Sequence, residues 1–132
     1  MAAVLDTHTV IWYCLSPRKL FDAALRFVRQ SIEQRKPVYV SAISLIETVY
    51  LLELGRIPFE TWNLLDAALK DTASGLSLTP VDAAIAEAVY RIPRNAVPDM
   101  PDRIIGATAL HMKSRLVTRD ARLRAAGIDT VW

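Results

Sequence analysis

Residues 37–55, PVYVSAISLIETVYLLELG, place a short strand directly before a capped helix. Residues 38–40 carry the β-branched and aromatic side chains that favour a strand. Ser41 or Ser44 can cap the helix that follows, and Gly55 can end it. A strand that runs straight into a helix is the repeating unit of α/β folds.

The same alternation continues on both sides of this stretch. The other short apolar runs that predict strands are residues 3–5, 76–78, 116–118 and 130–132. Apolar residues at helical spacing predict helices over 9–15, 21–35, 59–70, 79–90, 102–113 and 121–126. Strands that alternate with helices predict an α/β fold with a central, mainly parallel sheet.

Two of these helix starts have local signals. Thr79-Pro80-Val81-Asp82 offers a capping threonine, a proline in the first helical position and an acid three residues after the cap. Prolines at positions 93, 98 and 101 bracket a loop, so the next helix is expected to begin near Asp102.

Length and composition predict one globular domain over residues 1–132, because 52% of the side chains are apolar. No apolar run reaches the roughly 18 residues that a membrane span needs, and no basic stretch precedes an apolar one as in a secretory signal. The single cysteine, Cys14, is interpreted as a small buried apolar residue. These features fit a reducing cytoplasm and no membrane contact.

The net charge of +2 does not by itself indicate a polyanion partner, but the chain has twelve arginines and four lysines. Arg115, Arg119, Arg122 and Arg124 fall within ten residues. Arginine binds phosphate in a bidentate manner. The cluster is therefore either a solvated helix face or a contact for nucleic acid, and charge alone leaves both open.

Acidic residues follow the predicted strands. Asp6 comes directly after the first strand and Asp120 after the strand at 116–118, while Glu47 lies early in the helix that follows the second strand. Because the carboxyl ends of parallel strands meet at one edge of a sheet, these acids are expected to converge there. Asp99 and Asp102, at a helix start, join them only if the chain returns to the same edge.

Each acid also has an ordinary explanation, such as a turn at Asp6 with Thr7 or a helix cap at Asp99. Several carboxylates held together repel one another, and a divalent cation removes that cost. Oxygen ligands without histidine or cysteine favour Mg²⁺ or Mn²⁺, ions that activate water for phosphodiester hydrolysis.

Residues 4–7 (VLDT), 44–47 (SLIE), 99–109 (DMPDRIIGATA) and 117–120 (VTRD) together resemble PIN-domain ribonucleases. The likeness covers the whole chain in order and is greatest to the VapC toxins of toxin–antitoxin pairs. It implies a three-layer α/β/α sandwich and a Mg²⁺- or Mn²⁺-dependent endoribonuclease.

The resemblance also implies residue roles. The acids that match the catalytic quartet of the family are Asp6, Glu47, Asp102 and Asp120. Metal binding is assigned to Asp6, Asp99, Asp102 and Asp120, where Asp120 holds a second metal or orients water. Glu47 is expected to orient the attacking water or to shape the outer shell of the metal. Thr7 and Thr118 are expected to support the site. His8 departs from the small or hydroxyl residue common in the family. It lies either near the metal and the scissile phosphate or, as we favour, it packs or faces solvent at the mouth of the cleft.

Family partners are an RNA substrate, a second copy in a homodimer and an antitoxin whose C-terminal tail crosses the active-site groove. The apolar side chains offered to that tail are Tyr50, Leu51, Leu54, Ile57, Phe59 and Trp62, of which at least half are expected to belong to the core. Arg103, Arg119 and Arg122 are candidates for RNA phosphates or an antitoxin acid.

Other enzyme classes fit less well. Phosphatases of the haloacid-dehalogenase type need a second aspartate two residues after Asp6, where this chain has His8. A dinucleotide-binding fold needs a glycine-rich turn after the first strand, and this chain has none there. The remaining alternative is a catalytically inactive PIN-like module that binds RNA or protein. The complete set of acids argues against it.

Overall fold

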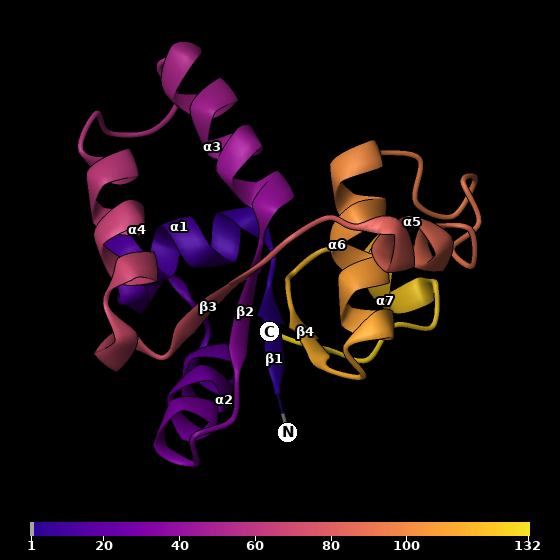
Figure 1. Ribbon diagram of the computed structural model, residues 1–132, viewed down its shortest axis with the longest axis horizontal. Helices are drawn as coiled ribbons and strands as arrows, with labels where there is room; N and C mark the ends of the chain where they lie inside the picture. The colour runs from indigo at the N-terminus through magenta and orange to yellow at the C-terminus, as the bar shows by residue number, and fades with distance from the viewer. Residues whose placement is uncertain (1) are drawn as a thin grey trace.

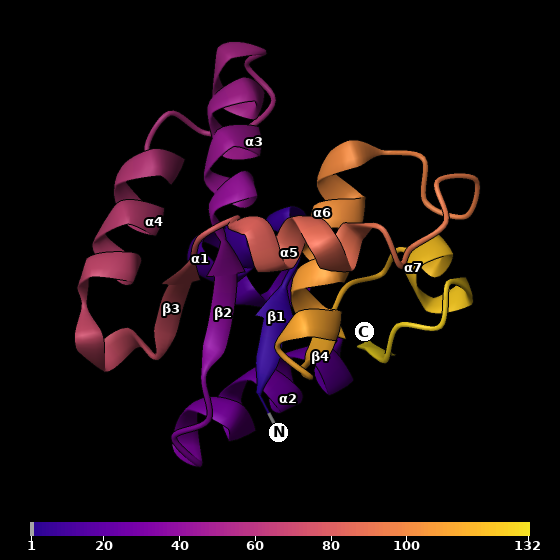
Figure 2. The same cartoon turned by 45° about the vertical axis from the view of Figure 1, so that its right-hand side comes forward.

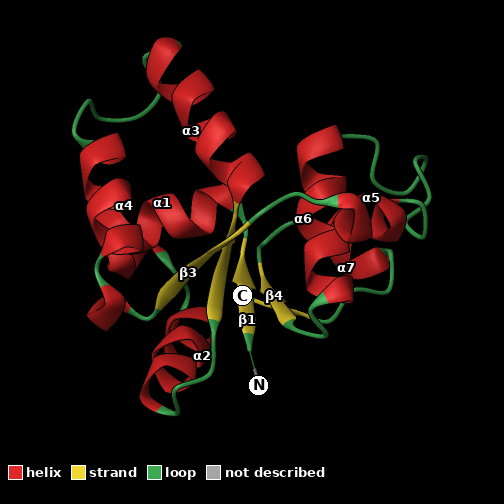
Figure 3. Cartoon of the chain, in the orientation of Figure 1, coloured by secondary structure: helices red, strands yellow, loops and turns green. Residues whose placement is uncertain are grey.

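The computed structural model describes residues 2–132, within which strands alternate with helices (Figure 3). The first half of the chain contains β1 (Ala3–Leu5), α1 (Thr7–Leu15), the 3₁₀ helix η1 (Pro17–Lys19), α2 (Asp22–Glu33), β2 (Val38–Ser41), α3 (Ala42–Glu53) and α4 (Thr61–Lys70). The second half contains the 3₁₀ helix η2 (Thr72–Ser74), β3 (Leu76–Thr79), α5 (Ala83–Val89), α6 (Met100–His111), β4 (Arg115–Val117), α7 (Ala121–Ala125) and β5 (Thr130–Val131).

The strands of the described residues form one sheet in the order β3-β2-β1-β4-β5, and every pair is parallel. The first strand therefore lies in the middle, where Leu5 is in register with Val40 on one side and Val117 on the other. Figure 2 shows β3, β2, β1 and β4 side by side. All carboxyl ends of the strands point to the same edge, as the predicted parallel sheet requires.

Helices cover both faces of the sheet (Figure 1). Leu5 and Val117 face a core shared with α1, α2 and α4, whereas Val4 and Leu116 face a core shared with α3, α5, α6 and α7. Successive strand residues point to opposite faces, so strands with helices on both sides are apolar throughout. The predicted three-layer α/β/α arrangement is confirmed.

The far half of α3 and the segment leading into α4 extend beyond the sheet (Figures 1 and 2). We expected at least half of the six apolar side chains offered to the antitoxin tail to be core residues, and this expectation is wrong. None of Tyr50, Leu51, Leu54, Ile57, Phe59 and Trp62 is buried, and Phe59 is 89% exposed. The first half of α3 packs against the two cores through Ile43 and Leu45, and Thr48 is buried. The apolar side chains beyond it are left partly or largely exposed.

One predicted helix start is also wrong. Thr79 is the last residue of β3, paired with Ser41 of β2, so its backbone serves the sheet and not a helix. Asp82 caps α5 instead and accepts a 3.0 Å hydrogen bond from the Ile85 amide. By contrast, Asp99 caps α6 as expected, and that helix begins at Met100.

Cys14 is partly buried on α1, and burial raises the pKa of its thiol, which keeps it protonated at neutral pH.

In the described part of the chain, no helix combines the length and apolar character needed to cross a membrane.

Candidate functional site

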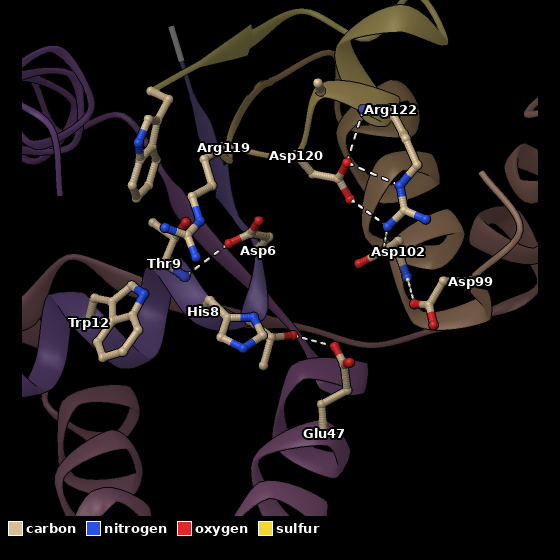
Figure 4. A pocket seen from close by; sticks show the side chains of 13 residues that line it. Asp6, His8, Thr9, Trp12, Glu47, Asp99, Asp102, Arg119, Asp120 and Arg122 are labelled. Carbon is tan, nitrogen blue, oxygen red and sulfur yellow. Dashed lines mark hydrogen bonds and ion pairs between the residues drawn. The ribbon is translucent and has the colours of Figure 1, made fainter. Parts of the chain in front are cut away.

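The carboxyl edge of the sheet opens into a cavity of about 630 Å³ (Figure 4). Its lining residues are Asp6, Thr7, His8, Thr9, Trp12, Glu47, Asp99, Asp102, Arg119, Asp120, Ala121, Arg122 and Trp132. The structure thus brings every predicted acid to one cavity. The chain does return to this edge, because α6 begins there with Asp99 as its cap.

Asp6 is fixed by bonds to both of its carboxylate oxygens. It caps α1, where Oδ1 accepts a 2.9 Å hydrogen bond from the Thr9 amide, and Oδ2 accepts the hydroxyl of Thr118. The Thr118 hydroxyl in turn accepts the Asp120 amide at 3.0 Å. Thr118 is buried and connects the end of β1 to the start of α7.

Glu47 reaches the cavity from α3. The Thr7 hydroxyl donates to its carboxylate, and Thr7 is also hydrogen-bonded to the Ser44 hydroxyl at 2.9 Å. Burial raises the pKa of Glu47, and the carboxylates of Asp99 and Asp6 add to this, although the bond from Thr7 and the nearby His8 oppose it. Thr7 thus holds the Glu47 carboxylate at the cavity wall by a hydrogen bond.

Asp99 and Asp102 come from the first turn of α6. The Asp99 carboxylate accepts the Asp102 amide at 3.1 Å. Burial raises the pKa of Asp102 to about 7, helped by the negative charges of Asp99, Asp120 and Glu47. This side of the cavity therefore holds more negative charge than its own protein contacts balance.

Arg122 contacts two of the acids. Its Nε lies 3.3 Å from Asp120 Oδ1 and its Nη2 lies 3.2 Å from Asp120 Oδ2, so the pair is bidentate. The same Nη2 lies 3.5 Å from Asp102 Oδ2. That longer contact does not offset the charges that raise the pKa of Asp102, because the Arg122 side chain is 55% exposed and screened by water.

The arginine cluster is not one solvated helix face. Arg115 lies in β4 and pairs with Asp129, whereas Arg124 on α7 donates to Thr130. The contact between Arg122 and Asp120 has one local signal in the sequence, because the two residues are only two positions apart.

The donor set of the cavity fits a divalent cation. Its carboxylates are the hard oxygen ligands that Mg²⁺ and Mn²⁺ prefer. Burial, helped by the neighbouring negative charges, raises the pKa of Asp102, and a bound cation would favour its charged form. Within residues 2–132, however, no three acidic, histidine or cysteine side chains already stand close enough to hold an ion. Three of these carboxylates are instead hydrogen-bonded within the protein, Glu47 to Thr7, Asp6 to Thr118 and Asp120 to Arg122.

Comparison with known proteins identifies the family. The sequence pattern of the PIN domain matches residues 3–128. The chain belongs to the PIN-domain family. Ribonuclease VapC22 of Mycobacterium tuberculosis is 32% identical over 126 residues, which cover 92% of this chain and 89% of the relative.

Solved structures share the fold of this PIN domain. The VapBC2 complex of Rickettsia felis, bound to a promoter DNA fragment, contains a chain with a TM-score of 0.74 and 16% identity, covering 99% of this chain and 98% of that one. FitAcB from Neisseria gonorrhoeae gives a TM-score of 0.61 and 23% identity, over 98% and 96% of the two chains. The resemblance read from the sequence is therefore confirmed.

The remaining walls of the PIN domain's cavity are aromatic and basic. In the view of Figure 4, Trp12, His8 and Arg119 lie on the other side of Asp6 from Asp102 and Arg122. His8 is exposed and lines the same cavity as the acids. Sequence analysis missed Trp12 and Trp132 because they lie near opposite ends of the chain, and no motif pairs them.

Arg103, a candidate for phosphate binding, does not line this cavity. Its Nη2 donates to the carbonyl oxygens of Val89 at 3.2 Å and Ile92 at 2.7 Å. Arg103 therefore ties α6 to the end of α5 and the turn that follows.

Proposed function

We propose that this PIN domain is a metal-dependent endoribonuclease and the toxin of a toxin–antitoxin pair. The observation that carries the proposal is the meeting of Asp6, Glu47, Asp102 and Asp120 in one cavity, although each comes from a different part of the chain. A curated relative that shares 32% of its residues with this chain is a ribonuclease of the VapC type. The order and spacing of the acids match that family.

The acids divide the work by position. Asp6 and Asp102 would hold the principal Mg²⁺ or Mn²⁺, and Asp99 and Asp120 would complete the acidic surroundings or hold a second ion. A bound ion of this kind lowers the pKa of water and neutralises charge that develops on the phosphate. Glu47 accepts a hydrogen bond from the attacking water, and its raised pKa suits a carboxylate oxygen that takes up a proton.

The aromatic and basic wall suits an unpaired nucleotide. Indole rings stack on bases, and guanidinium groups bind phosphate. Trp12, Trp132 and Arg119 line the same cavity as the acids, so a base can stack beside the phosphate that is cut. Unpaired RNA in loops or single strands is the substrate class that this arrangement favours.

The exposed apolar surface on α3 and α4 suits the antitoxin tail. A groove of about 510 Å³ there is lined by Leu52, Glu53, Gly55, Ile57, Phe59, Trp62 and Asn63. Structural neighbours include a toxin–antitoxin complex from Klebsiella pneumoniae. We expect the toxin to form a homodimer and to act in the cytoplasm, where its RNA substrate is.

Cleavage of a mixed cellular RNA pool by purified protein, with Mn²⁺ or with EDTA, tests the activity. The variants to compare are Asp6→Asn and, as a matched control, Asp66→Asn. Asp66 is a carboxylate on α4 that pairs with exposed Lys70 and lies outside the cavity. We expect discrete cuts that need Mn²⁺, disappear in Asp6→Asn and persist in Asp66→Asn.

Near-wild-type cleavage by Asp6→Asn at saturating Mn²⁺ would overturn the assignment of the acids. Absence of cleavage by folded wild-type protein, free of copurified antitoxin, would favour an inactive module that binds RNA or protein.

A further inference from the structure

Arg122 contacts carboxylate oxygens of two residues proposed to bind metal. Both carboxylate oxygens of Asp120 contact its guanidinium, and Oδ2 of Asp102 lies 3.5 Å from its Nη2 (Figure 4). A guanidinium and a divalent cation are both positively charged. They compete for these carboxylate oxygens, because two cations held close together repel each other.

The position of Arg122 lets it leave without disturbing the fold. It lies on α7, and its backbone amide donates to the Asp120 cap at 2.9 Å whether or not its side chain stays in place. The side chain is 55% exposed. Exposed ion pairs are individually weak, so water can replace the guanidinium at small cost.

Its neighbour on α7 behaves differently. Arg124 donates to the Thr130 hydroxyl and does not line the cavity. Arg119 does line the cavity, but it stands on the side of Asp6 away from Asp102 in the view of Figure 4. The contacts with both Asp102 and Asp120 thus single out Arg122 on α7.

We propose that Arg122 is an exchangeable counter-ion of the acidic centre. It pairs with Asp120 and contacts Asp102 in the metal-free protein, and it is displaced when a divalent cation binds. The inference rests on the proposed metal-dependent function. It follows that Arg122 weakens the metal affinity of the protein while it stabilises the metal-free fold.

Calorimetric titration of Mn²⁺ into the purified protein tests this inference without measuring activity. The variants are Arg122→Gln, Arg122→Lys and the control Arg124→Gln, which removes the same charge from the same helix. We expect Arg122→Gln to bind Mn²⁺ roughly three- to tenfold more tightly, as loss of a weak competing ion pair implies. Arg122→Lys should lie between that variant and wild type, and Arg124→Gln should match wild type.

Two further readouts follow the displacement itself. The metal-free Arg122→Gln protein should unfold at a lower temperature than wild type and gain more thermal stability from Mn²⁺. In wild-type protein, the Nε–H resonance of Arg122 should shift during titration with diamagnetic Mg²⁺, whereas that of Arg124 should stay in place.

The outcomes separate this inference from the proposed function. Equal or weaker Mn²⁺ binding by folded Arg122→Gln overturns the counter-ion role and leaves the metal site standing. Equal tightening in Arg124→Gln also overturns it, since the effect is then one of net charge. If wild type and Arg122→Gln both fail to bind Mn²⁺, the metal-dependent function fails, and the inference fails with it.

Discussion

The hydroxyl of Thr118 donates a hydrogen bond to the carboxylate of Asp6, although the two residues stand 112 positions apart. The same hydroxyl accepts the amide of Asp120. One buried threonine therefore sets the position of two proposed metal ligands, which come from the ends of neighbouring strands β1 and β4.

Replacing Thr118 by valine keeps the side-chain shape and removes the hydroxyl. Because partners behind metal ligands typically contribute 10–100-fold to affinity or activity, we expect RNA cleavage to fall by about that factor. Mn²⁺ affinity should fall as well. Thr108→Val is the control, since the Thr108 hydroxyl is also buried but donates only to the Ile104 carbonyl within α6. Equal losses in both variants would contradict a role specific to the site.

The raised pKa of Asp102 predicts a pH dependence of the metal-free protein. The folded-state pKa of about 7 lies above the ordinary value of 3.8, so the folded protein holds a proton that the unfolded chain has lost between these values. The free energy of unfolding should therefore fall as pH rises from about 4 to about 7. Thermal unfolding in EDTA measures this decline.

Asp102→Asn isolates the contribution of that carboxyl, because asparagine has a similar shape and carries no charge. In EDTA, its melting temperature should decline less than that of wild type over the same pH range. With Mn²⁺, wild type should recover stability above pH 7 and the variant should recover less. If the melting temperatures of the two metal-free proteins change identically with pH, the Asp102 carboxyl is not the cause of the pH dependence.

Two arginines that looked alike in the sequence should separate by experiment. Arg103→Met removes the guanidinium that donates to the carbonyls of Val89 and Ile92. The Val89 carbonyl keeps its bond from the Ile92 amide, but the loss of the partner of the Ile92 carbonyl should cost about 1–3 kcal/mol of the free energy of unfolding. Arg119→Gln removes an exposed charge from the cavity wall, so stability should stay and RNA affinity should fall. Chemical denaturation should show a loss of stability in Arg103→Met and not in Arg119→Gln. RNA-binding measurements should show a loss of affinity in Arg119→Gln.

Trp12 provides a test of base stacking. Stacking of one base on an aromatic side chain typically contributes about 1–3 kcal/mol, so Trp12→Leu should weaken binding of a single-stranded RNA oligonucleotide by roughly tenfold or more. Fluorescence anisotropy in EDTA measures binding without cleavage. Trp62→Leu is the control, because Trp62 lines the groove on α3 and α4 and not the acidic cavity. Unchanged affinity in Trp12→Leu would exclude stacking on this ring.

Antitoxin binding and substrate binding should respond to different surfaces. Phe59→Ser changes an 89% exposed side chain in the α3–α4 groove. We expect it to weaken the complex with the antitoxin and to leave RNA cleavage by the free protein unchanged. Co-purification of the pair and cleavage by the isolated variant measure the two effects. Loss of cleavage with an intact complex would place the antitoxin elsewhere.

Local sequence determined the elements and the candidate acids of this protein. The apolar run at 38–40 and the caps at Ser41 and Asp99 are short-range features, because a strand or cap depends on neighbours a few residues away. Acids that directly follow strands were also readable, since parallel strands bring their carboxyl ends to one edge. The ordered motifs then indicated the PIN-domain family.

Tertiary structure alone decided how those pieces meet. Thr79 carries a helix-start signal, yet its backbone pairs with Ser41 in the sheet and so does not begin a helix. Phe59 is apolar, yet no layer of the described chain reaches it. The bonds from Thr118 to Asp6 and from Arg122 to Asp102 join positions that are distant in the chain. Such contacts depend on the packing of whole layers, which no local pattern of residues encodes.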